Sequence, residues 1–103
     1  MPRYLLMAMN NPLPGEENAA AFAKWYDEIH IPDLLATPGV KYAKRYKIVS
    51  TKTPRPWTNV AVYEIETDDL PGVFEHLQTK TRPFDPSFDR SQSESITAIE
   101  LED

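Results

Sequence analysis

Apolar residues recur along the first third of the chain in two different patterns. Residues 4–9 form a continuous apolar run, which has the length of a strand and is typical of one covered on both faces. Residues 16–30 carry apolar side chains at helical spacing, with Tyr26 and His30 near the middle of the apolar face. Because the residue before a proline is pushed out of the α conformation, we expect this helix to break at Pro32, with one short turn after it.

The rest of the chain has the patterns of three more strands, one helix and a long loop. The first of these strands, residues 40–49, is described in the next paragraph. Residues 59–66 are rich in β-formers, and residues 95–102 form a similar final strand. Residues 70–79 carry an apolar stripe at helical spacing. The intervening residues 80–94 form a long loop, and such loops in compact domains are often functional or partner-facing.

Residues 40–49 alternate between an apolar and a basic side, which predicts a half-buried strand. The apolar side consists of Val40, Tyr42, Tyr46 and Ile48, and the basic side of Lys41, Arg45 and Lys47. Lys44 adds to the basic run, which we interpret as solvated side chains on a strand rather than as an anion-binding patch.

The resulting order, β-α-β-β-α-β, is the split-βαβ or ferredoxin-like arrangement of the α+β class. Residues 1–103 are enough for one domain and too few for two. We expect the two helices to cover one face of a four-stranded antiparallel sheet. Because the first strand is apolar on both faces, the other face also needs cover, which a sheet from a second subunit could supply.

Composition and charge narrow the classes of function. The formal net charge of -5 argues against a nucleic-acid partner, since little in the chain would neutralise phosphates. The chain has no cysteine, which excludes disulfides, a thiolate nucleophile and a cysteine zinc site and fits a reducing compartment. The apolar run at residues 4–9 is too short to span a bilayer and is not followed by a cleavage site. We therefore expect a cytoplasmic protein without membrane contact.

One stretch of the sequence also carries a family resemblance. Residues 25–32, Trp-Tyr-Asp-Glu-Ile-His-Ile-Pro, are followed by Leu34-Leu35, by Pro38-Gly39-Val40 and by Arg45-Tyr46. This series resembles the EthD-like branch of the dimeric α/β-barrel superfamily, whose members include cofactor-independent polyketide cyclases, muconolactone isomerases, small monooxygenases and haem-degrading enzymes. The resemblance implies a homodimer whose sheets close into a barrel, with a ligand cleft between sheet and helices in each subunit. It does not choose among these chemistries.

His30 is the strongest candidate for chemistry. An imidazole exchanges protons near neutral pH, and the place of His30 on the apolar face points it toward the sheet. A buried histidine needs a hydrogen-bond partner, and Asp27, three residues earlier, is placed to orient the ring. Tyr26, one turn earlier, would hold a carbonyl or enolate oxygen. The alternatives are a structural histidine bonded to a backbone carbonyl or a tyrosine, and a core tyrosine. The resemblance implies that His30 lines the cleft.

Further candidates for substrate binding are Trp25, Trp57, Tyr46, Tyr63 and Arg45. The tryptophans are suited to stack on an aromatic ligand and equally suited to pack in the protein. The tyrosines lie on strands whose register the sequence does not fix. Arg45 would bind a carboxylate, although an exposed arginine on a strand is the better interpretation.

No metal or cofactor site is expected. Two separated histidines, His30 and His76, without a cysteine make a poor set of metal ligands. The three glycines do not form a phosphate-binding loop. We expect His76, Glu28 and Asp33 to face water.

The sequence therefore predicts a cofactor-independent cyclase, isomerase or lyase that acts on a small aromatic or polyketide-like substrate. His30 would be the general acid/base, Tyr26 would hold an oxygen, and Asp27 would orient the imidazole. Two alternatives remain open: a non-catalytic binding protein for a hydrophobic metabolite, and a cofactor-free monooxygenase.

Overall fold

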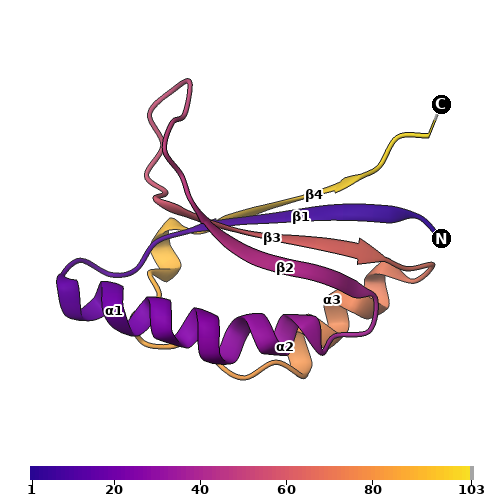
Figure 1. Cartoon of the computed structure of the whole chain (residues 1–103), viewed down its shortest axis with the longest axis horizontal. Helices are drawn as coiled ribbons and strands as arrows, with labels where there is room; N and C mark the ends of the chain where they lie inside the picture. Colours follow the sequence, from indigo (N-terminus) through magenta and orange to yellow (C-terminus); the bar gives the residue numbers. More distant parts are fainter. Residues whose placement is uncertain (103) are drawn as a thin grey trace.

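The computed structural model describes residues 1–102 and consists of one four-stranded sheet with helices packed on one of its faces (Figure 1). The elements are, in chain order, β1 (Arg3–Asn10), α1 (Glu16–Trp25), η1 (Tyr26–His30), α2 (Ile31–Leu35), β2 (Val40–Lys47), β3 (Asn59–Glu66), α3 (Leu70–Thr79), η2 (Arg90–Gln92) and β4 (Glu94–Ile99). The strand order is β2-β3-β1-β4, and neighbouring strands are antiparallel. The predicted α+β, ferredoxin-like arrangement is confirmed.

The first helix does not break at Pro32, so that prediction is wrong. Residues 26–30 form a π-helical turn, η1, and the helix continues without interruption from α1 into α2. The backbone N–H of Ile31 donates to the carbonyl of Tyr26, five residues back. This wider turn leaves room for the proline ring, and Pro32 lies in the first turn of α2, where a missing N–H is tolerated. Tyr26 and His30, at the two ends of the π turn, are both buried.

A bulge in β2 changes the predicted facing of its side chains. The register against β3 shifts between Val40 and Tyr42, which inserts one extra residue into β2. As a result Arg45 lies on the face covered by the helices, whereas Tyr42 and Tyr46 share the other face, where their hydroxyls are hydrogen-bonded to each other. The prediction is therefore right in placing Tyr42 and Tyr46 opposite Arg45, and wrong in placing Val40 with the two tyrosines, because a one-residue insertion reverses the facing of every residue beyond it. The strand also ends earlier than predicted, at Lys47.

The core lies between the helices and one face of the sheet. Its most completely buried apolar side chains are Tyr26, Phe22, Leu34 and Ile65. Aromatic rings from α1 and η1 therefore form the centre of the layer between helix and sheet. Among residues 1–102, no helix is long and apolar enough to cross a lipid bilayer.

The opposite face, called here the open sheet face, has no helix over it within the described residues (Figure 1). Side chains in register across the four strands form its apolar part: Leu5, Met7, Val62, Tyr46 and Ile96. Leu5 is 38% exposed, Tyr46 45% and Ile96 55%. Within a single chain β1 is thus covered on one face only, and not on both as its apolar run predicts.

Candidate functional site

A cleft of about 270 Å³ opens between the sheet, the π-helical turn and the loop that precedes β4. Its lining consists of Ala8, Met9, Asn10, Tyr26, His30, Tyr63, Phe84, Phe88, Ser93, Glu94 and Ser95. The walls are largely aromatic with a few polar groups, as is typical of small-molecule sites. Within residues 1–102, no three histidine, aspartate or glutamate side chains are grouped so as to hold a metal ion.

A larger hollow, of about 510 Å³, lies at the end of the sheet near the start of β1. Leu5, Glu64 and Ala98 line it and lie in register across β1, β3 and β4 on the open sheet face. None of the candidate residues from the sequence contributes to it. The smaller cleft is the candidate site, because it contains titratable side chains buried among apolar groups, the surroundings in which proton chemistry is usually arranged.

The imidazole of His30 forms part of the cleft wall and is only 5% exposed. It stacks on the indole of Trp25, with ring centroids 4.7 Å apart, and meets the rings of Tyr26 and Phe84 edge-on at 5.2 and 5.3 Å. Its Nδ1 is buried without a hydrogen-bond partner among residues 1–102, so Nε2 is the nitrogen that can reach a bound molecule. Burial lowers the pKa of His30 to about 4, and the charge of Asp33 opposes this only in part. The ring is therefore neutral at pH 7.

Asp27 does not orient this imidazole, and that prediction is wrong. Its carboxylate accepts hydrogen bonds from Nε and Nη2 of Arg45, at 3.0 and 3.4 Å. The Arg45 side chain is only 22% exposed, and its guanidinium lies 5.5 Å from the centroid of the Tyr26 ring. The bulge in β2 explains the difference, since it turns Arg45 toward the helix and gives Asp27 a charged partner. Arg45 is therefore engaged within the protein rather than exposed.

The hydroxyl of Tyr26 is held by Asn10, at the end of β1. Nδ2 of Asn10 donates to the Tyr26 oxygen at 2.8 Å and to the carbonyl of Ala8 at 3.2 Å, which fixes the orientation of the amide. Burial raises the pKa of Tyr26 to about 12, although the bond from Asn10 and the charge of Arg45 act in the opposite direction. Burial also raises the pKa of Tyr63. Both phenols stay protonated at neutral pH, and Tyr26 keeps its own proton for donation.

The other candidates from the sequence lie outside the cleft. Trp25 packs behind the imidazole with 4% of its surface exposed. Tyr46 lies on the open sheet face, and Trp57 belongs to the loop between β2 and β3. Those that do line the cleft are Tyr26, His30 and Tyr63.

The residues that complete the lining were not predicted from the sequence. Phe84 and Phe88 come from the long loop before β4, and their ring centroids lie 4.7 Å apart. The length of that loop indicates a functional role but does not identify the side chains that turn inward. Asn10 precedes Asn11 at the end of a strand, where asparagine is common for its turn-forming ability. Nothing in its position therefore indicates its contact with Tyr26.

Unpartnered polar atoms gather around the cleft. Among the residues that the structure describes, four side-chain polar atoms are buried without a hydrogen bond: Nδ1 of His30, Oδ1 of Asn10, Nε1 of Trp25 and, away from the cleft, Nδ1 of His76. His30 and Asn10 line the cleft, and Trp25 stacks on His30. Since buried polar groups nearly always find a partner, such a cluster indicates a place where ordered water supplies one.

Comparison with known proteins identifies the fold. No family model and no curated protein matches the sequence. A DABB family protein with a ferredoxin-like fold from Mesorhizobium loti aligns over 99% of this chain and 100% of its own, with 13% identity and a TM-score of 0.62. An ethyl tert-butyl ether d (EthD) family protein from Bacillus halodurans aligns over 98% and 100%, with 14% identity and a TM-score of 0.56. This chain has a ferredoxin-like fold.

A third solved structure, a proposed monooxygenase from Shewanella loihica, aligns over 99% of this ferredoxin-like chain and 96% of its own, with 11% identity and a TM-score of 0.54. At these identities the likeness concerns the fold alone. The resemblance carried by residues 25–32 is thus confirmed at the level of the fold. Ferredoxin-like proteins host many chemistries, so activity has to be argued from the cleft.

Proposed function

We propose that the protein is a cofactor-independent enzyme of the cyclase, isomerase or lyase type, acting on a small aromatic or polyketide-like substrate bound in the cleft. The observation that carries this proposal is the imidazole of His30, which is buried in the cleft wall with Nδ1 unpartnered among the described residues. A buried nitrogen without a hydrogen bond lowers stability, and in contrast to His76, whose Nδ1 is also unpartnered, the His30 side chain lines the cleft.

The neutral state of His30 allows its imidazole to accept a proton. With a pKa of about 4, the ring is almost wholly in its basic form at pH 7, and Nε2 can accept a proton from a substrate. A base this weak suits a substrate whose own proton is acidic, such as that of a carbon between two carbonyls. Tyr26 would donate a hydrogen bond to the enolate oxygen that develops. Return of the proton from the imidazolium to a different carbon completes an isomerisation. In a cyclisation the enolate carbon attacks a second carbonyl of the same substrate, and the imidazolium gives the proton to the alkoxide oxygen that forms.

The lining supports an uncharged, planar substrate. It contains no lysine or arginine, and the nearby Arg45 and Arg82 are each paired with an aspartate. An anionic substrate would therefore lose its hydration without gaining a counter-charge. The rings of Tyr63, Phe84 and Phe88 offer surface on which a planar molecule can stack.

Two other functions have a specific observation in their favour. The lowered pKa makes His30 a weak base, which favours a non-catalytic binding protein for a hydrophobic metabolite. A neighbour in fold, the Shewanella loihica protein, is described as a proposed monooxygenase, which favours a cofactor-free monooxygenase. A binding protein would show thermal stabilisation by its ligand without turnover, whereas a monooxygenase would consume oxygen.

We propose further that a second copy of the chain covers the open sheet face. Leu5, Tyr46 and Ile96 leave an apolar surface on this face that a single chain does not bury. A contiguous apolar surface of this kind marks an interaction site in soluble proteins, and a twofold dimer is the commonest way to cover one. Two such sheets packed face to face would enclose both surfaces in a barrel.

Replacing His30 by glutamine tests the enzyme proposal. The native protein is incubated with phenols, β-diketones and linear polyketide-like ketones, and products and oxygen consumption are followed. We expect the turnover of a substrate found in this way to fall about 10²–10⁴-fold in His30→Gln, because a positioned acid/base is lost. The matched control is His76→Gln, which removes the histidine outside the cleft and keeps full turnover. Undiminished turnover in His30→Gln would show that His30 is not the acid/base.

A further inference from the structure

The loop between α3 and β4 supplies two aromatic side chains of the cleft lining. These are Phe84 and Phe88, and the part of the loop that carries them is called here the aromatic wall. The ring of Phe84 meets those of Trp25 and His30 edge-on, with centroids 5.4 and 5.3 Å apart, yet 40% of Phe84 remains exposed. Phe84 therefore separates the buried imidazole and indole from solvent.

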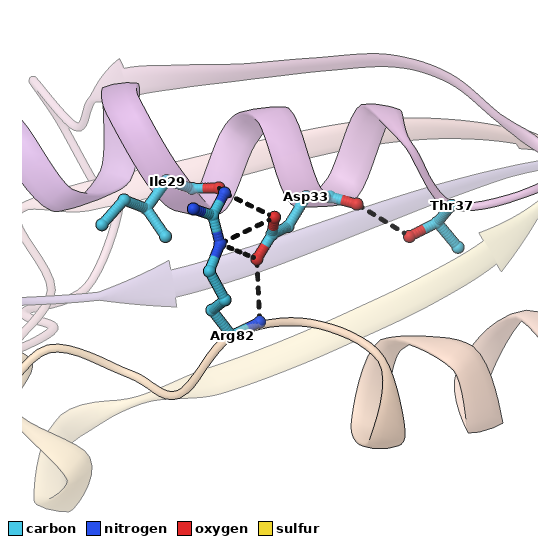
Figure 2. Close-up of polar contacts among 4 residues, drawn as sticks. All are labelled: Ile29, Asp33, Thr37 and Arg82. Carbon is cyan, nitrogen blue, oxygen red and sulfur yellow. Dashed lines mark hydrogen bonds and ion pairs between the residues drawn. The ribbon is translucent and has the colours of Figure 1, made fainter.

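One end of this wall is fastened to α2 by Arg82 (Figure 2). The Asp33 carboxylate accepts the backbone N–H of Arg82 and its Nη2, both at 2.8 Å, and Nε lies 3.2 Å from each carboxylate oxygen. Nη2 also donates to the carbonyl of Ile29 in the π turn at 3.4 Å, and the Thr37 hydroxyl donates to the Asp33 carbonyl at 3.0 Å. The Asp33 side chain, which was expected to face water, is only 17% exposed. The hydrogen bonds from Arg82 lower the pKa of Asp33 and keep it ionised.

The other end of the wall is fastened by main-chain hydrogen bonds to the segment after β1. The N–H of Leu13 donates to the carbonyl of Ser87 at 2.7 Å, and the N–H of Asp89 donates to the carbonyl of Asn11 at 3.0 Å. Phe88, between these two bonds, forms a β-bridge with this segment. This attachment does not depend on any side-chain charge.

Between the two attachments, residues 83–86 make no hydrogen bond to another element within the described chain. Pro83 and Pro86 have no N–H to donate. The place of Phe84 therefore depends on its ring contacts and on the two attachments. At the first attachment the Arg82 side chain is 58% exposed, and exposed ion pairs contribute little to stability. The end at Arg82 is thus the one that opens more readily.

We propose that Asp33 and Arg82 are positioning residues that hold Phe84 over His30 and so set the size of the molecule that the cleft admits. With Phe84 in place the cleft measures about 270 Å³, which is below the usual range of ligand pockets, about 300–1,000 Å³. Breaking the contact lets Phe84 move away and makes room for a substrate of more than one ring. This inference rests on the proposed function in one respect: it takes the cleft as the place where the ligand binds.

Acrylamide quenching of Trp25 fluorescence reports whether the aromatic wall is closed. The background for the measurement is Trp57→Phe, which leaves Trp25 as the only tryptophan. Arg82→Ala and Asp33→Asn each remove the side-chain ion pair, and both leave the backbone N–H of residue 82 in place. The matched control is Arg55→Ala, which removes an exposed arginine that has no ion pair within residues 1–102.

We expect the quenching constant of Trp25 to rise about twofold or more in Arg82→Ala and Asp33→Asn, because local opening exposes the indole. Arg82→Lys, which keeps the positive charge, restores most of the protection. The double variant is quenched no more than either single variant, because both substitutions remove the same side-chain ion pair. Arg55→Ala matches the background protein.

Equal quenching in Arg82→Ala and in the Arg55→Ala control overturns the proposal, as does an additive effect in the double variant. A purely structural role would lower the unfolding midpoint while Trp25 stays protected, and that result overturns it too. If Arg82→Ala does not fold, Asp33→Asn and Arg82→Lys carry the same comparison. No substrate is needed, so the enzyme proposal can fail while this one holds.

Discussion

At the scale of single residues, His30 determines what the cleft can do. Its ring is 5% exposed and stacked on Trp25, and Nδ1 has no partner among residues 1–102. A protonated imidazole in this place would be a buried charge without a counter-ion in contact, since Asp33 acts on it only through space. The native protein therefore resists protonation of His30 and keeps the ring in its basic form over the whole neutral range.

The low pKa of His30 makes stability fall with acid in a defined range of pH. The unfolded chain binds a proton at His30 near its ordinary pKa of 6.5, whereas the native protein binds it near 4. Between these values the unfolded state holds more protons, so the free energy of unfolding decreases as the pH falls. Across the whole range this loss amounts to about 3 kcal/mol.

Urea unfolding of the native protein and of His30→Gln at pH 7.5 and 4.5 measures this loss. We expect the native protein to lose more stability between the two values than His30→Gln does, because only the native protein has the histidine. Carboxylates other than Asp33, whose pKa the charge of His30 also lowers, contribute equally to both proteins and cancel. Equal losses, or an NMR titration midpoint of His30 near its ordinary value, would contradict the prediction.

At the scale of elements, the strands and helices were predictable and the irregularities that shape the site were not. Apolar spacing indicated β1, the long first helix and α3, because each has its own period. The π turn adds one residue to a single helical turn, a change too local to be inferred from apolar spacing, so the sequence shows a proline but not how the helix accommodates it. The bulge in β2 depends on pairing with β3 and has no local signal. Beyond that bulge, Arg45 lies on the helix side of the sheet, where it and not His30 contacts the carboxylate of Asp27.

The loop between α3 and β4 shows the same limit. Its length indicated a functional role, but residues 80–93 have no periodicity from which to predict which side chains turn inward. Arg82 meets Asp33 across 49 residues of sequence. Asp33 was expected to face water, and the sequence does not show that Arg82 lies beside it in the fold. The inward position of Tyr26 and His30 was predictable, since helical spacing places both on the apolar face.

At the scale of the whole molecule, the two faces of the sheet differ in what covers them. The helices cover one face, and His30, Tyr26 and Tyr63 meet in the cleft on that side. The open sheet face carries exposed apolar side chains and no helix within the described chain. A second copy can therefore cover the open sheet face while the cleft stays available, which is why we propose a dimer with one site in each subunit.

A charge placed on the open sheet face tests the proposed dimer. Ile96 is 55% exposed in the single chain, so Ile96→Glu leaves the core intact but puts a charge into the proposed interface. The matched control is Leu35→Glu on α2, where a leucine of similar exposure, 48%, lies away from this face. Light scattering should give a dimer for the native protein and for Leu35→Glu, and a monomer for Ile96→Glu. A monomeric native protein, or an unchanged mass in Ile96→Glu, would contradict the proposal.

The central claim is that a small, uncharged aromatic molecule binds beside His30. An NMR titration of the native protein with 4-methylphenol, a molecule of one ring, followed on the histidine and aromatic side chains, tests it most directly. We predict saturable shifts at His30 and Tyr63, with His76 unchanged. Unchanged His30 signals throughout the titration, together with shifts at Tyr46 and Ile96, would instead place the molecule on the open sheet face and contradict the claim.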